Sequence, residues 1–401
     1  MFQMKAVFKY LYAGARARVL FNFVVVQLAC IPLVSCLPDG ERDARGVPGV
    51  IVHQVDTPSL LKRVLGRAVY TTSPSIAVLP GGDYVISANI FGRGSGADIS
   101  GTTFIYRSAD KGGNWQLLTT LLDMKRGSLF VHEGSLYIWG YTAAPGSIVI
   151  RKSEDGGHSW TTPEDGTSGL LREGRFGGTP CNPVVHGERL WIAQGGRRVM
   201  SAPADADLLS ADSWLLSNAA DTASAPFGEK LIVTEAQVAA SSGTGVVILP
   251  KIGGHPYTVL IRAGAGPAEV IHPATEDWIR IPGGEKKFAA AHDPVSNRFI
   301  ALSNPVMPAF AESGWPPELI RNTAALLSSD DLKSWSMNHI FLHSDNVDYE
   351  AFQYLNFDID GEDLVIVSRT AFDVGGTRPP RGHDSNLITF HRINDFRRFL
   401  D

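Results

Sequence analysis

Short apolar runs interrupted by glycine-containing turns recur along most of the chain. Each pair of runs flanks a turn of two or three residues, which is the pattern of a β-hairpin. Four such turns are Gly81-Gly82-Asp83, Glu133-Gly134, Gly187-Glu188 and Asp360-Gly361-Glu362. The pattern predicts an all-β chain, in which the one stretch with helical character lies near Pro58–Arg67.

The repetition of these hairpins predicts six units of four antiparallel strands. The units span residues 73–121, 128–165, 182–218, 229–273, 285–344 and 350–396. Such units form a β-propeller when they are arranged around an axis, and this architecture leaves no long sheet edge exposed. Residues 49–70 either add a strand that closes the ring or begin a seventh blade, and we favour six blades. Residues 51–401 are therefore expected to form one propeller domain.

Three octapeptides of the same design strengthen this prediction. They are Ser108–Trp115, Ser153–Trp160 and Ser328–Trp335, and they follow the pattern Ser-x-Asp-x-Gly-x-x-Trp, with Leu332 at the glycine position of the third. In such a turn the Ser and Asp side chains cap backbone N–H groups, glycine adopts a positive φ, and Trp fills the space between sheets. Weaker echoes lie at Ser210–Trp214 and Thr275–Trp278. We expect these turns to be structural.

The N-terminal segment has the features of an export signal. Four basic residues and no acidic residue precede an apolar stretch from Val19 to Val34, and the sequence Leu33-Val34-Ser35-Cys36 follows. The last four residues resemble a bacterial lipobox, which implies lipidation of Cys36 after removal of residues 1–35. Residues 36–50 are then a tether. We expect anchoring in the bacterial cell envelope, periplasmic or at the outer membrane; simple secretion and a retained anchor are the alternatives.

The composition of the chain argues against several classes of function. The 401 residues are 44% hydrophobic and 19% charged, as in an ordinary globular protein. The net charge is -5 and becomes -9 without residues 1–35, so nucleic acid is not an expected partner. Three cysteines are too few for a disulfide framework, and Cys181 is most simply a buried small apolar residue. No residue pattern indicates a metal site or a cofactor.

The candidate catalytic residues are concentrated near the C-terminus. Loops that leave the inner strands of a propeller meet near its axis, and ligands bind there. Arg369 ends an apolar strand and is suited to bind a carboxylate, while His383 beside Asp384 is suited to proton transfer. Tyr354 is a candidate nucleophile or proton donor. The alternatives are that Arg369 pairs with a nearby acid, that His383 is solvated, and that Tyr354 packs between blades.

Further polar residues follow predicted strands or glycine-rich turns in other units. We consider them candidate substrate-binding residues, with Glu235 also a candidate acid: Arg93, Arg175, Glu235, Lys287 and Arg321. Each has the alternative of an ordinary structural role.

The octapeptides are the Asp boxes of sialidase-like propellers, so residues 70–400 resemble the sialidase superfamily. True sialidases carry an early Phe/Tyr-Arg-Ile-Pro motif, an arginine triad and a Tyr–Glu nucleophile pair, whereas this sequence contains no Arg-Ile-Pro. The segment from Phe352 to Arg392 also resembles bacterial BNR-repeat proteins related to ulvan and rhamnosyl-glucuronate lyases. That resemblance implies that Arg369 neutralises a uronate while His383 and Tyr354 exchange protons.

The sequence therefore predicts an exported, lipid-anchored propeller enzyme that cleaves anionic glycans bearing uronic or sialic acids. Lyase and hydrolase chemistry both remain open, and the protein is expected to be a monomer. The alternative is a non-catalytic surface lipoprotein that binds glycan or protein through the same face.

Overall fold

The computed structural model describes residues 46–55, 69–92, 101–227 and 231–400. The export signal, Cys36, most of the tether, the helical stretch near Pro58–Arg67 and Arg93 lie outside these ranges. Within them, no helix is long and apolar enough to cross a membrane.

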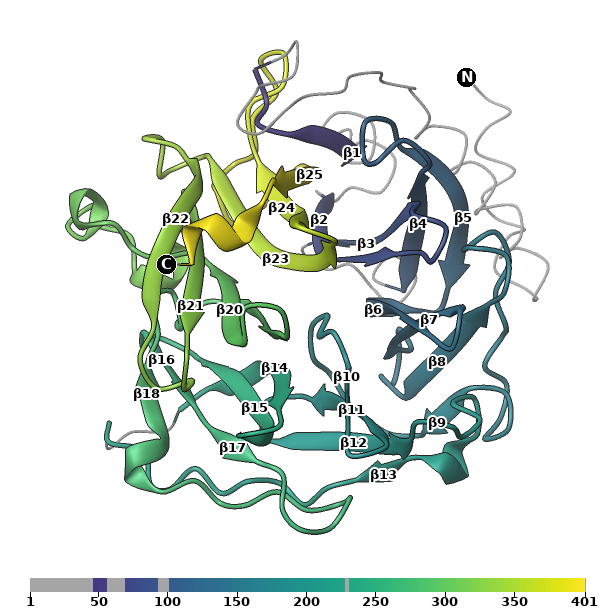
Figure 1. Cartoon of the computed structure of the whole chain (residues 1–401). Helices are drawn as coiled ribbons and strands as arrows, with labels where there is room; N and C mark the ends of the chain where they lie inside the picture. The colour runs from purple at the N-terminus through teal and green to yellow at the C-terminus, as the bar shows by residue number, and fades with distance from the viewer. Residues whose placement is uncertain (1–45, 56–68, 93–100, 228–230, 401) are drawn as a thin grey trace, which may run out of the picture.

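Six antiparallel blades surround a common centre (Figure 1). The first strand of each blade is its innermost one, and these strands are β2, β6, β10, β14, β19 and β23. This confirms the predicted all-β, six-bladed propeller. The strands of blades 1 to 3 are β2 (Val69–Val78), β3 (Tyr84–Gly92), β4 (Thr102–Ser108), β5 (Gln116–Leu122), β6 (Lys125–His132), β7 (Ser135–Tyr141), β8 (Ile148–Ser153), β9 (Leu170–Arg172), β10 (Val184–His186), β11 (Arg189–Gln194), β12 (Arg198–Pro203) and β13 (Leu215–Leu216).

Blades 4 to 6 complete the ring. Their strands are β14 (Val233–Ser241), β15 (Gly245–Ile252), β16 (Tyr257–Val259), β17 (Ile261–Arg262), β18 (Trp278–Arg280), β19 (Ala289–Asp293), β20 (Arg298–Ser303), β21 (Thr323–Ser329), β22 (Ser336–His343), β23 (Ala351–Asp360), β24 (Asp363–Ala371), β25 (Leu387–Ile393) and β1 (Val50–Gln54). The short 3-10 helices are η1 (Ala211–Ser213), η2 (Thr275–Asp277), η3 (Pro308–Phe310), η4 (Pro317–Leu319) and η5 (Phe396–Phe399).

Two of the predicted four-strand units ended too early in the sequence. Blade 2 ends with β9 and blade 4 ends with β18, beyond the predicted ends at 165 and 273. In blade 4 the third strand is interrupted at Leu260, so that β17 pairs with β15 while β16 pairs with β18. The interruption separates two short hydrogen-bonded stretches, which made the fourth strand of this unit hard to see in the sequence.

The ring is closed by the N-terminal strand. β1 pairs antiparallel with β25, with Val50 opposite Phe390 and Gln54 opposite Leu387, and becomes the outermost strand of blade 6. Of the two alternatives for residues 49–70, the closing strand is therefore correct. Side chains also join blade 6 to blade 1: the Phe390 ring packs 5.8 Å from Tyr84 and 5.4 Å from Trp115, measured between centroids.

The Asp boxes connect the third and fourth strands of blades 1, 2 and 5. In the second box the Gly157 N–H donates to Ser153 Oγ at 2.8 Å and the Ser159 N–H donates to Asp155 Oδ1 at 2.9 Å, as the motif predicts. The third box differs by one position from our alignment. There Asp331, rather than Asp330, accepts the N–H of Ser334 at 2.9 Å.

The innermost strands set the two faces of the propeller. We call the face where these strands begin the entry face, and the opposite face, with the glycine hairpins and Asp boxes, the box face. Four innermost strands carry a β-bulge near the entry face, and each bulge contains one residue with a left-handed backbone. Bulges redirect side chains and often lie beside functional sites. The four residues are Ser73, Arg126, Glu235 and Tyr354.

Candidate functional site

Two of the bulge residues meet across the entry face. The Tyr354 hydroxyl of β23 donates a hydrogen bond to Glu235 Oε1 of β14 at 3.0 Å. Their φ angles are 53° and 55°, a conformation that a non-glycine residue keeps only when its surroundings impose it. The carboxylate beside Tyr354 thus comes from blade 4. Glu350, which is close to Tyr354 in the sequence, instead accepts a hydrogen bond from Ser344 Oγ.

Glu235 is held as a carboxylate by a lysine that the sequence analysis missed. Lys251 Nζ lies 2.9 Å from Glu235 Oε2, and the two side chains are 17% and 13% exposed. Burial disfavours the charged carboxyl group, but the charge and hydrogen bond of Lys251, the Tyr354 hydroxyl and the charge of Arg321 together lower the pKa of Glu235 below its usual value. Glu235 can therefore accept the proton of Tyr354 at neutral pH.

Two buried arginines flank the Tyr354 ring. The guanidinium carbons of Arg369 and Arg321 lie 5.1 Å and 5.7 Å from the ring centroid. Arg369 donates to the carbonyl of His383, and burial lowers its pKa to about 10, so it is still a cation at neutral pH. Arg321 Nε donates to the Glu318 carbonyl at 2.8 Å.

Neither arginine forms an ion pair with an acidic side chain in the described part of the chain. Arg369 Nε is buried and has no hydrogen-bond partner there. Burying unpaired cations is costly unless an anion completes the site. The arrangement is therefore suited to an anionic group placed beside Tyr354.

Gln353 holds the residues of this cluster together by hydrogen bonds. In the sequence, only its position beside Tyr354 pointed to such a role. Its side-chain oxygen accepts a hydrogen bond from Arg321, and its nitrogen donates to the Gly382 carbonyl at 2.7 Å and to Ser385 Oγ at 2.8 Å. Gln353 is fully buried. It thereby joins Arg321 of blade 5 to the loop between β24 and β25.

His383 lies on the other side of Arg369. Its Nδ1 is 2.8 Å from Asp384 Oδ1, and its ring packs edge-on against Phe91 at 6.2 Å between centroids. The Asp384 hydrogen bond raises the pKa of His383, but burial and the charges of Arg369 and Arg321 outweigh it, and the net pKa is lowered. The imidazole is therefore neutral near pH 7 and is able to accept a proton.

Two other candidate residues, Lys287 and Arg175, and the free cysteine Cys181 do not belong to this cluster. Lys287 is buried beneath β23 and donates to the carbonyl of Leu355, and burial lowers its pKa to about 8, so it supports the Tyr354 bulge and does not face a substrate. Arg175 is exposed between β9 and β10, and no described contact links it to the cluster. Cys181 is buried, and burial raises the pKa of its thiol to about 11, in agreement with a packing role.

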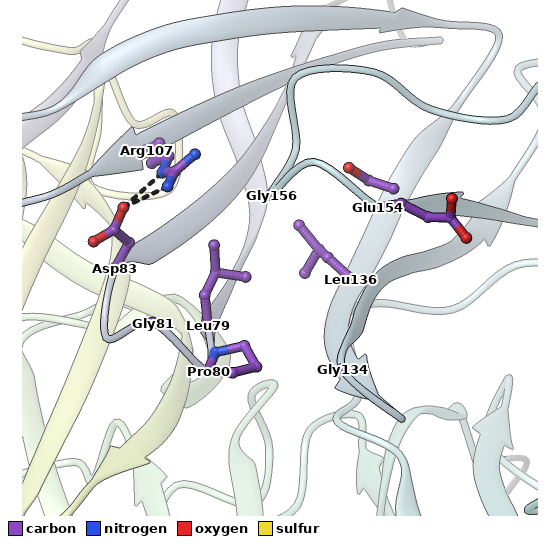
Figure 2. A pocket seen from close by; sticks show the side chains of 10 residues that line it. Leu79, Pro80, Gly81, Asp83, Arg107, Gly134, Leu136, Glu154 and Gly156 are labelled. Carbon is purple, nitrogen blue, oxygen red and sulfur yellow. Dashed lines mark hydrogen bonds and ion pairs between the residues drawn. The ribbon is translucent and has the colours of Figure 1, made fainter.

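A pocket of about 370 Å³ lies on the opposite, box face (Figure 2). It is formed between the Gly81–Asp83 hairpin of blade 1 and the Asp box of blade 2. In its wall, Arg107 Nη2 lies 2.6 Å from Asp83 Oδ2. None of the predicted site residues lines it. Over the described ranges, no group of three His, Cys, Asp or Glu side chains could hold a metal ion.

Comparison with solved structures gives the same architecture. The Hadza microbial sialidase Hz136 superposes with a TM-score of 0.50 at 12% identity, covering 81% of this chain and 66% of that one. The α-L-arabinanase of Penicillium chrysogenum gives 0.53 at 14% identity, covering 91% and 99%. The intramolecular trans-sialidase of Ruminococcus gnavus gives 0.51 at 12% identity, covering 81% and 94%.

No protein-family model and no curated protein sequence matches the chain. The structural likeness, at these identities, establishes the fold alone: a six-bladed β-propeller that matches those of the sialidases and the arabinanase.

Proposed function

We propose that this protein is a carbohydrate-active enzyme that hydrolyses glycosidic bonds of anionic glycans at the entry face. One observation carries the proposal: Tyr354 donates to the buried carboxylate of Glu235 while two arginines without acidic partners flank its ring. The names of the structural neighbours support it, since they include a sialidase, an arabinanase and a trans-sialidase.

The arrangement suits a covalent mechanism with a tyrosine nucleophile. Arg321 and Arg369 bind the carboxylate of the sugar. The Tyr354 oxygen forms a bond to the anomeric carbon, its proton passes to Glu235, and the glycosidic bond breaks with the electron pair leaving on the aglycone oxygen, which takes a proton from water. A second water then attacks the anomeric carbon and loses one proton to solvent, the sugar–tyrosine bond breaks, and the Tyr354 oxygen regains its proton from Glu235. A tyrosine is neutral before attack, so it is not repelled by the substrate carboxylate as an aspartate or glutamate nucleophile would be.

Elimination is the second candidate, and it is favoured by His383. The imidazole lies beside Arg369, is oriented by Asp384, and has a lowered pKa. Arg369 would neutralise a uronate, and His383 would remove the proton on the carbon next to the carboxylate as the bond to the leaving oxygen breaks.

One assay distinguishes these reactions. The protein is incubated with uronate-bearing polysaccharides and sialylated glycans, while reducing sugar and the ultraviolet absorbance of unsaturated uronate are followed together. We expect reducing sugar without absorbance, abolished by Tyr354→Phe and retained in the matched control Tyr349→Phe. Rising absorbance that depends on His383 would establish elimination instead. Glycan binding with neither product would support the non-catalytic alternative.

Export and lipidation are part of the proposal. The signal-like segment ends at Cys36, 14 residues before Val50 at the start of β1. Because β1 runs antiparallel to β25, it starts at the box face, so a lipid on Cys36 would leave the entry face directed away from the membrane. The test is fractionation: Cys36→Ser should move the protein from the membrane fraction to the soluble fraction.

A further inference from the structure

Arg126 occupies on blade 2 the position that Glu235 and Tyr354 occupy on blades 4 and 6. Each of the three is the left-handed residue of a bulge near the start of an innermost strand. Strained backbone of this kind concentrates at functional sites because the surrounding structure must impose it. At Arg126 the Asn89 side chain imposes it: the Arg126 N–H donates to Asn89 Oδ1 at 2.8 Å, and Asn89 is itself buried.

The Arg126 side chain is exposed and lies on the entry face. Its Nη1 donates to the carbonyl of Gly178 at 3.0 Å, and no acidic side chain in the described ranges forms an ion pair with it. The cation therefore retains most of its hydrogen-bond donors. Lys125 beside it adds a second positive charge, with its ammonium group on the Ala143 carbonyl at 2.6 Å.

A short series of glycines connects Arg126 to the proposed catalytic pair. Gly178 follows Gly177, whose carbonyl lies against Gly195, and the Gly195 carbonyl accepts the N–H of Ala236 at 3.0 Å, directly after Glu235. Gly177 and Gly195 are half-buried and have no side chains to cover the surface between Glu235 and Arg126, whereas Gly178 is buried under the Tyr141 hydroxyl. Next to Gly178, the hydroxyl of Thr179 is buried and has no hydrogen-bond partner among the described residues.

We infer that this strip is a subsite for the sugar next to the one held by Arg321 and Arg369, and that Arg126 binds an anionic substituent of that sugar. The inference rests on the proposed function and names its substrate class: a glycan with acidic groups on successive residues, not one with a single terminal acid. The substituent is a carboxylate or a sulfate ester, because a guanidinium donates paired hydrogen bonds to either group.

Binding to the Tyr354→Phe protein tests the subsite without turnover. The probes with two or more acidic groups are the disaccharide and tetrasaccharide of oligogalacturonate and of ulvan, and the desulfated ulvan tetrasaccharide. Sialyllactose and the hyaluronan disaccharide each have one acidic group. In this background Arg126→Ala should weaken binding of probes with two acidic groups by about tenfold and leave sialyllactose unchanged. Arg126→Lys should recover part of the loss. Arg280→Ala, an exposed arginine on the outer strand of blade 4, is the control for a change in net charge.

The outcomes separate the subsite from the proposed function. An equal loss for singly and doubly charged probes, or no loss, overturns the subsite even if wild-type protein cleaves the glycans. Loss that disappears on desulfation assigns a sulfate, and loss that persists assigns a carboxylate. Wild-type protein that neither binds nor cleaves any probe overturns both proposals.

Discussion

Replacing Lys251 by methionine tests the electrostatics of the proposed catalytic pair. Methionine keeps most of the apolar volume of the side chain but removes the ammonium group that lies 2.9 Å from Glu235 Oε2. The carboxylate would stay in its buried position with only Tyr354 and the charge of Arg321 to stabilise it. Burial, which is the largest influence on the pKa of Glu235, would then raise that pKa above its ordinary value.

The expected loss of stability follows from burial. Removing one partner of a buried ion pair costs about 3–5 kcal/mol of unfolding free energy. Because both side chains are partly exposed, we expect a loss at the lower end, about 3 kcal/mol, which is roughly a hundredfold in the folded-to-unfolded ratio. In the wild-type protein the folded pKa of Glu235 is depressed. Its contribution is therefore present above the pKa of Glu235 in the unfolded chain, near the ordinary value of 4.5, and is lost as pH falls through the folded pKa.

In the variant the folded pKa is raised, so protonation of Glu235 removes the penalty as pH falls. The difference in unfolding free energy between wild type and Lys251→Met should consequently be largest at pH 7 and smaller at pH 4. Denaturant unfolding at both pH values measures it. The control is Lys152→Met, which removes an exposed pair with Glu154 at 2.7 Å and should cost less than about 1 kcal/mol. Equal losses for the two variants, or a loss independent of pH, would refute the reasoning.

Three further results are expected. Tyr354→Phe should lower kcat on the order of 10³-fold or more with little change in KM, because the hydroxyl forms the bond to the sugar; kinetics with full activity would exclude this role. Leu332→Gly should destabilise the protein even though it restores the Asp-box glycine. Relief of the left-handed strain is worth about 1 kcal/mol, whereas removing the buried leucine costs about 2–5 kcal/mol, so a higher midpoint in denaturant would contradict us. Phe390→Ala should cost about 3–5 kcal/mol because this buried ring joins blade 6 to blade 1, and an unchanged melting temperature would contradict that account.

Local chemistry in the sequence determined the architecture. Hairpin glycines and Asp boxes act within about eight residues, so they can be identified without knowledge of distant contacts, and they predicted six blades. The third box shows the limit of this approach. Ser328-Ser329 and Asp330-Asp331 are doublets, and only the pairing of β21 with β22 decided that Asp331 caps the turn.

The site depended on contacts between distant residues. Arg369, His383, Tyr354, Arg321 and Glu235 were identified singly from the sequence, since polar residues after apolar strands are visible there. Their grouping was not visible, because Tyr354 and Glu235 are 119 positions apart and meet only when blades 4 and 6 close around the axis.

Side-chain direction was also decided by tertiary structure alone. Lys287 follows a glycine-rich turn, as the exposed candidate Arg175 does, but its side chain turns inward to the Leu355 carbonyl. Arg126, at the start of β6, was not a candidate in the sequence, yet its side chain projects from the entry face. A bulge of one residue reverses the face to which a side chain points, and the partner strand determines where that bulge forms. The sequence by itself therefore determined the propeller and its candidate residues, and the packing of the blades decided which of them meet.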